Sequence, residues 1–207
     1  MELFDKLFGK TPGGIAPESR LTAEREAVVN ASESAREAAR LLREPTALMQ
    51  LSEAEALTVV GFMRPRRYQA GTTIIRQGEV DDTGFMVLVL AGEITVEKHQ
   101  ASRRSPVTLN VLGPGSLIGE MALVDGEARS ASCTASTVVH CAVLTREALE
   151  ALIAEQPATA AKLMTAVAGR LADRLRESSL KLQVTNKLVL TLQEEIDALL
   201  PTPSRRN

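Results

Sequence analysis

The sequence predicts a mainly β fold with flanking helices: an antiparallel sandwich or jelly roll, an N-terminal helix before it and a long C-terminal coiled-coil helix after it. Two observations predict this fold. Between residues 66 and 144, short β-branched or alternating runs are separated by Gly, Pro, Asp and Asn. From residue 157 to about residue 200, apolar residues recur at alternating steps of four and three.

Length and composition limit the possible classes of protein. The chain has 207 residues and is 44% hydrophobic, which suits one ordinary core with an accessory helical element. Its 24 Lys+Arg against 26 Asp+Glu indicate no general affinity for nucleic acid or anionic membranes. No apolar run approaches the roughly 20 residues that span a bilayer, and MELFDKLFGK lacks a signal-peptide core. We therefore expect a cytoplasmic protein without a membrane partner.

The N-terminal region is expected to contain a tip and two helices. Residues 1–17 combine an apolar cluster with TPGGIAP, which predicts a flexible tip. Residues 18–44 are rich in Ala, Glu and Arg and carry apolar residues at seven-residue steps, so a helix is predicted there, ended by Pro45. Ser52 and Glu55 form a capping-box pattern that starts a second helix, which should run to about Met63.

The β-rich region forms the centre of a predicted domain at residues 46–156. Its strand-like segments lie at 68–78, 84–99, 107–116, 128–136 and 137–144. Cys133 and Cys141 occur in neighbouring strands without metal-ligand spacing, which indicates buried, reduced thiols. Thr145 is a predicted N-cap for the helix TREALEALIAEQ that closes the domain.

Residues 157–200 are predicted to form one helix, with Pro157 at its first position and a tail at 201–207. Its seam consists of Met164, Ala168, Leu171, Leu175, Ser178, Leu182, Thr185, Val189, Leu192, Ile196 and Leu199. Since a lone helix cannot bury such a stripe, the pattern favours a parallel homodimer through this helix. The alternative is an intramolecular hairpin with the helix at 18–44.

The segment GSLIGEMALVDGEARSAS, at 115–132, contains the candidate binding residues. A turn at Gly119 followed by a short helix would aim backbone N–H groups at an anion, and Arg129 would add a guanidinium suited to phosphate. Glu120 is a suitable acceptor for a ribose hydroxyl. The pattern therefore indicates a nucleotide of low charge. In the alternative interpretation, the glycines only form turns and Glu120 pairs with Arg129.

The run IGEMALVDGEARSASCTA, at 118–135, is similar to the phosphate-binding cassette of the cyclic nucleotide-binding domain, which protein kinase A regulatory subunits, cyclic-nucleotide-gated channels and bacterial catabolite activator proteins share. The resemblance covers roughly residues 46–180 and is supported by RQGEVDDTGFMVLVLAGEITV at 76–96. It implies an eight-stranded jelly roll and a ligand that is cAMP or cGMP, with cAMP favoured and no cofactor. The departures are Ile118, Met121 and Ala128, and none removes a charge or a donor.

The resemblance also implies a role for each candidate residue. Glu120 would accept the ribose 2′-OH, and Arg129 would pair with the cyclic phosphate. The amides around Met121 and Ala122, which follow the turn at Gly119, would complete the phosphate cradle. Ser130 would hydrogen-bond the phosphate or the base. On the C-terminal helix, Arg174 is the candidate contact to the purine.

The predicted output is regulatory. The sequence PTPSRRN after Leu200 leaves no room for a helix-turn-helix domain, so we expect no DNA binding, and no catalytic motif is present. The chain is predicted to be a non-enzymatic sensor whose ligand shifts the C-terminal helix and its contacts with an unknown downstream protein. Two alternatives remain: a ligand-independent dimeric scaffold with a degenerate cassette, and a sensor of cyclic di-GMP. The second would use Arg174 or the pair Arg103 and Arg104 as a further basic group.

Overall fold

A computed structural model describes residues 32–199, except 46, 49, 82 and 100–105. The predicted tip at 1–17, most of the helix at 18–44, the pair Arg103 and Arg104 and the tail at 201–207 lie outside the described residues. The chain divides into two compact units between Val167 and Ala168, and each unit is described by itself.

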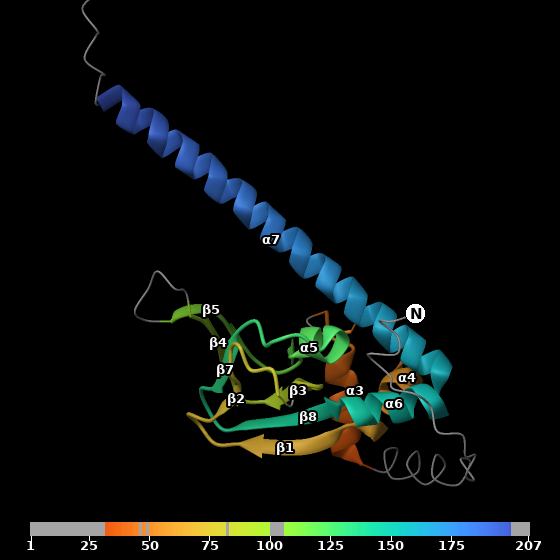
Figure 1. The fold of residues 1–207 in the computed structure, drawn as a ribbon. Coiled ribbons are helices and arrows are strands. Elements are labelled where there is room, and N and C mark those ends of the chain that lie inside the picture. Colours follow the sequence, from red (N-terminus) through yellow and green to blue (C-terminus); the bar gives the residue numbers. More distant parts are fainter. Residues whose placement is uncertain (1–31, 46, 49, 82, 100–105, 200–207) are drawn as a thin grey trace, which may run out of the picture. The chain divides into compact units, whose positions relative to one another are not determined.

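Eight strands form two four-stranded sheets in the first unit, and every pairing is antiparallel. The strands are β1 (Arg64–Tyr68), β2 (Thr73–Ile75), β3 (Phe85–Ala91), β4 (Ile94–Lys98), β5 (Val107–Leu112), β6 (Leu117–Ile118), β7 (Ser132–Ala135) and β8 (Val139–Thr145). One sheet has the order β1-β8-β3-β6 and the other β2-β7-β4-β5 (Figure 1). The predicted eight-stranded jelly roll is confirmed.

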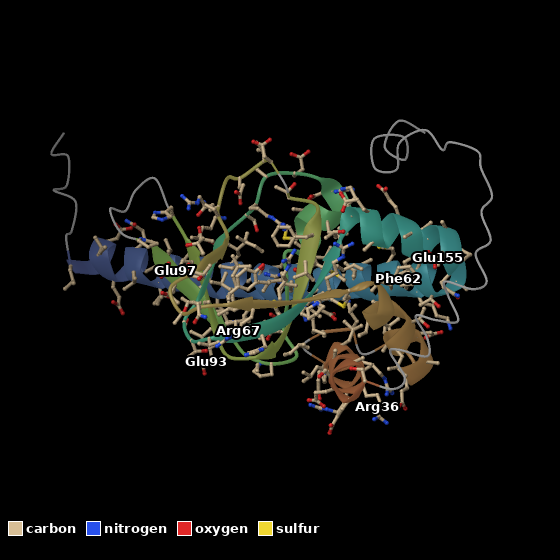
Figure 2. The ribbon with its side chains drawn as sticks, turned by 90° about the horizontal axis from the view of Figure 1, so that it is seen from below. Arg36, Phe62, Arg67, Glu93, Glu97 and Glu155 are labelled. Carbon is tan, nitrogen blue, oxygen red and sulfur yellow. The ribbon has the colours of Figure 1, made fainter. Side chains whose placement is uncertain are left out.

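The main core cluster draws residues from strands of both sheets, because alternate residues of a strand point to the same face. Its buried members are Ile75, Val87, Val89, Ile94, Ile118, Cys133, Ala135, Val139, Cys141 and Val143. Both cysteines are buried free thiols, as predicted, and burial raises the pKa of Cys141 to about 11. Charged side chains such as Arg36 and Arg67, which are labelled in Figure 2, are exposed.

The predicted helix at 18–44 is only partly confirmed. Helix α3 (Glu33–Leu42) begins at Ser32, which has extended backbone and accepts a hydrogen bond from the Ala35 amide at 3.3 Å. The prediction of one helix that runs unbroken through residue 32 is therefore wrong, because the Ser32 hydroxyl caps the start of α3. The buried face of α3 packs against α4 and β3.

The two other predicted side-chain caps, at Ser52 and Thr145, are confirmed. Helix α4 (Glu53–Phe62) has the capping box of Ser52 and Glu55. Helix α6 (Arg146–Glu155) starts at Thr145, whose hydroxyl accepts from the Ala148 amide at 3.3 Å. Both cap patterns involve residues three apart, so the sequence alone is sufficient to locate them.

Helix α7 (Pro157–Leu199) has 43 residues and begins at the predicted proline. Within the first unit it buries Ala160, Leu163, Ala166 and Val167. Met164 and Ala168, the first two residues of the predicted seam, are not among these buried residues, and their contact with a second helix stays a prediction. From Leu175 to Leu199 the large apolar side chains of α7 are exposed. In the part of the chain that the structure describes, no helix is long and apolar enough to cross a membrane.

Candidate functional site

The predicted short helix at the cassette is present. Strand β6 leads into Gly119, which has φ +80° and caps α5 (Glu120–Asp125). A side chain at Gly119 would meet the Arg129 Nη1 atom at 2.8 Å from its Cβ and the Phe85 carbonyl oxygen at 3.0 Å. Both the left-handed backbone and the close approach therefore require glycine here.

The first turn of α5 presents backbone amides and one buried carboxylate. Glu120 is 1% exposed and Ala122 is 3% exposed, whereas Met121 between them is 41% exposed. Amides in the first turn of a helix have no acceptor within that helix, so those of Met121 and Ala122 can donate to an external anion. The structure thus brings together Gly119, Glu120, Met121 and Ala122 on one short element.

Arg129 lies beneath this turn and is 4% exposed. Its Nη1 donates to the Gly119 carbonyl at 2.9 Å and its Nη2 to the Phe85 carbonyl at 3.1 Å. The guanidinium also stacks over the Phe85 ring, 4.4 Å from the centroid. These two hydrogen bonds hold the guanidinium beside the N-terminus of α5.

The backbone of Arg129 is fixed by the loop after β2. Its amide donates to the Glu79 carbonyl at 3.0 Å, and its carbonyl accepts from the Gly78 amide at 2.8 Å. The predicted strand at 128–136 includes Arg129, and this is wrong, since β7 begins only at Ser132. The pairing with Gly78 and Glu79 places the arginine in the preceding loop, where its side chain reaches back under α5.

The remaining predicted residues lie at the edge of this site or outside its unit. Ser130 is exposed, and its hydroxyl makes a weak 4.0 Å contact with the Met121 sulfur, so the two side chains are neighbours. Arg174 is exposed on α7 in the second compact unit, and its contact with the ligand stays a prediction. Among the described side chains, no group of three His, Cys, Asp or Glu could hold a metal ion.

The sequence analysis missed Arg146, the first residue of α6. Its Nη2 donates to the Ala122 carbonyl at 3.2 Å, and its amide donates to the Gly84 carbonyl at 2.6 Å. Arg146 therefore links the cassette helix α5 to the start of α6. A basic residue in the first turn of a helix opposes the helix dipole, and this mismatch was the available signal for another role.

Phe85 was also missed. It is the first residue of β3, and both its carbonyl and its ring contact Arg129. The two residues are 44 positions apart, so no local pattern connects them.

Comparison with known proteins agrees with this geometry. The family described as "Cyclic nucleotide-binding domain" matches residues 65–156. A cyclic nucleotide-gated potassium channel of Rhizobium etli is 40% identical over 90 residues, which cover 44% of this chain and 23% of the channel. The cyclic AMP receptor protein of Thermus thermophilus is 34% identical over 134 residues, which cover 65% of this chain and 59% of that protein. The chain thus spans less than two thirds of either relative.

Solved structures give the same result. A cyclic nucleotide-binding domain from Methylobacillus flagellatus superposes with a TM-score of 0.63 at 27% identity, covering 77% of this chain and 85% of that one. The catabolite activator protein of Thermus thermophilus superposes with a TM-score of 0.59 at 31% identity, covering 70% and 63%. Residues 65–156 of this chain therefore belong to the cyclic nucleotide-binding domain family.

Proposed function

We propose that this protein is a non-enzymatic sensor that binds a cyclic nucleotide, with cAMP favoured over cGMP, and passes the binding signal to helix α7. The observation that carries the proposal is the buried Arg129 guanidinium, held by two carbonyls beside the first turn of α5. A phosphate at this position would receive charge-assisted hydrogen bonds from the guanidinium and from the Met121 and Ala122 amides. The Thermus thermophilus relative, which matches over 134 residues, is named a cyclic AMP receptor protein.

The ligand preference is tested by titration calorimetry of the full chain with cAMP, cGMP and cyclic di-GMP. We expect cAMP to bind most tightly, with a dissociation constant near 1 μM, or about −8 kcal/mol. If cyclic di-GMP bound more tightly than cAMP, cyclic di-GMP would become the proposed ligand in place of cAMP. Failure of all three to bind would instead support a ligand-independent scaffold.

Glu120 is proposed to accept the ribose 2′-OH, because its carboxylate is buried at the first position of α5. Wild type should bind cAMP roughly 10- to 100-fold more tightly than 2′-deoxy-cAMP, since a hydrogen bond to a charged group contributes about 1.5–3 kcal/mol. In Glu120→Gln this ratio should shrink, because the charged acceptor is gone. Calorimetry with both ligands measures the ratio. An unchanged ratio in a folded Glu120→Gln variant would remove Glu120 from the ribose site.

The signal is proposed to pass from α5 to α6 through Arg146 and from α6 into α7. A ligand that moves the first turn of α5 also moves the Ala122 carbonyl, to which the Arg146 side chain donates a hydrogen bond. Arg146 is also the first residue of α6, so a shift of α5 changes the position of α6. A coupling free energy of about 1–3 kcal/mol is typical of such switches.

Arg146→Gln should separate binding from response. We expect cAMP still to bind, while the cAMP-induced change in amide hydrogen exchange of α6 falls to less than half of the wild-type change. Arg67→Gln, on exposed β1, is the control and should leave both quantities at wild-type values. An unchanged exchange response in Arg146→Gln would show that the signal takes another route.

The output is proposed to be a change at a parallel homodimer formed by the seam of α7, with Arg174 beside the ligand and a downstream protein as receiver. The exposed apolar side chains at Leu175, Leu182, Val189, Leu192 and Ile196 support such a seam. The predicted cytoplasmic location and the absence of DNA binding stay predictions.

A further inference from the structure

Gln77, in the loop that follows β2, joins this loop to the end of β4. Its side-chain Nε2 donates to the His99 carbonyl at 3.2 Å, and the His99 amide donates to its Oε1 at 2.7 Å. The carboxamide therefore bonds both backbone groups of His99, as a neighbouring strand would. The two residues are 22 positions apart, so no local pattern in the sequence connects them.

The place that the Gln77 side chain occupies lies on the line of β7. Strand β7 is between β2 and β4 in the sheet, and its pairing with β4 sets Glu97 opposite Ser132 (Figure 1). Antiparallel strands pair in opposite order, so the same register continued past Glu97 would set His99 opposite Ser130. Strand β7 instead begins at Ser132. The Gln77 side chain thus bonds His99 where the Ser130 backbone would do so in a longer strand.

The loop after β2 also holds the chain on both sides of Ser130. The Gln77 amide donates to the Ser132 hydroxyl at 3.0 Å. The two residues that follow Gln77 bond the amide and the carbonyl of Arg129. Between these contacts the chain leaves the line of β7, and the Arg129 side chain reaches the N-terminus of α5.

We infer that Gln77 is a positioning residue for Arg129: by bonding His99, it keeps Ser130 out of the sheet and the arginine beside α5. This inference rests on the proposed function, in which Arg129 binds the cyclic phosphate. Without the carboxamide, the backbone of His99 pairs with that of Ser130, and β7 becomes longer. Because Arg129 is the next residue along the chain, this pairing moves its backbone away from the loop after β2.

The variant Gln77→Met tests this role, because it keeps the length of the side chain and removes both hydrogen bonds. We expect it to bind cAMP about 5- to 10-fold more weakly in titration calorimetry, since apparent affinity falls with the competent fraction and about 80–90% of free molecules would have the longer strand. The urea midpoint should stay near that of wild type, because the lost bonds are exposed and water replaces them.

The matched control is Gln69→Met, which makes the same change in the loop between β1 and β2. Gln69 is exposed. Its loop lies at the other end of β7, where the Gly71 amide donates to the Ala135 carbonyl at 2.7 Å. This variant should bind cAMP with wild-type affinity.

Two further measurements separate positioning from a general loss of structure. In an Arg129→Lys background, Gln77→Met should weaken cAMP binding by less than about 2-fold, because its effect acts through the arginine. In ligand-free Gln77→Met, a nuclear Overhauser contact between the His99 and Ser130 amides should appear that wild type lacks. An equal loss of affinity in both backgrounds would overturn the positioning role.

The possible results distinguish this inference from the proposed function. If wild type binds cAMP and folded Gln77→Met binds it equally well, the positioning role is overturned and the sensor is retained. If wild type binds no cAMP, the sensor is overturned, and the Overhauser contact decides whether Gln77 keeps Ser130 out of the sheet. Absence of this contact in ligand-free Gln77→Met overturns the inference in either case.

Discussion

Arg129→Lys is expected to weaken cAMP binding by at least about 100-fold, which corresponds to about 2.8 kcal/mol. Lysine keeps the positive charge but has no planar fork, so it cannot hold the Gly119 and Phe85 carbonyls and a phosphate in the same way. Because the arginine is buried and bonded to both carbonyls, the variant should also lose stability, by roughly 1–3 kcal/mol. Titration calorimetry measures the affinity, and a urea denaturation curve measures the stability.

The matched control for this variant is Arg66→Lys, on the exposed edge strand β1. It makes the same chemical change away from the cassette and should leave cAMP affinity unchanged. The titrations are made without urea, under conditions in which circular dichroism shows that both variants are folded. Wild-type affinity in a folded Arg129→Lys variant would show that the guanidinium does not bind the phosphate.

Gly119→Ala should have the largest effect on stability among single changes at the cassette. Alanine at φ +80° costs roughly 1–2 kcal/mol, and its Cβ would lie 2.8 Å from Arg129 Nη1 and 3.0 Å from the Phe85 oxygen. Overpacking of this kind adds roughly 1–3 kcal/mol. We therefore expect the free energy of unfolding to fall by roughly 2–5 kcal/mol, with weaker cAMP binding because α5 and Arg129 are displaced.

Gly78→Ala separates the two causes of this loss. Gly78 has φ +79°, and a Cβ there would meet no atom within 4 Å. Alanine at Gly78 should therefore cost only the backbone strain, roughly 1–2 kcal/mol. Urea denaturation followed by circular dichroism measures both variants. Equal losses at the two positions would show that the contact between Gly119 and Arg129 is not tight in solution.

The parts of the fold that were predictable depend on contacts between near neighbours in the sequence. Ser52 with Glu55, and Thr145 with Ala148, are three residues apart, and each cap was predicted correctly. Strand alternation likewise depends on adjacent residues. The glycine turn, Glu120 and Arg129 were identified within one short segment, where spacing and the family resemblance agree.

The features that were not predicted depend on contacts between distant residues. Arg129 bonds Phe85 across 44 positions, and Arg146 bonds Ala122 across 24. The buried face of the first turns of α7 is set by the domain on which they pack, not by the heptad pattern that continues after them. The sequence pattern places Ser32 in the middle of a helix, whereas in the structure it is an N-cap. Its hydroxyl accepts a hydrogen bond from the Ala35 amide, which competes with helical backbone hydrogen bonding.

The most direct test of the proposed site is an amide chemical-shift titration of the ¹⁵N-labelled chain with cAMP. We expect the amides of Gly119, Glu120, Met121, Ala122 and Arg129 to shift together along one saturation curve. The control region is a groove away from the cassette, lined by residues of α3, β1 and β8 that include Arg36, Arg66 and His140. Its amides should stay unchanged. Saturable shifts confined to this control groove, or no shifts at millimolar cAMP, would contradict the binding of a cyclic nucleotide at α5 and Arg129.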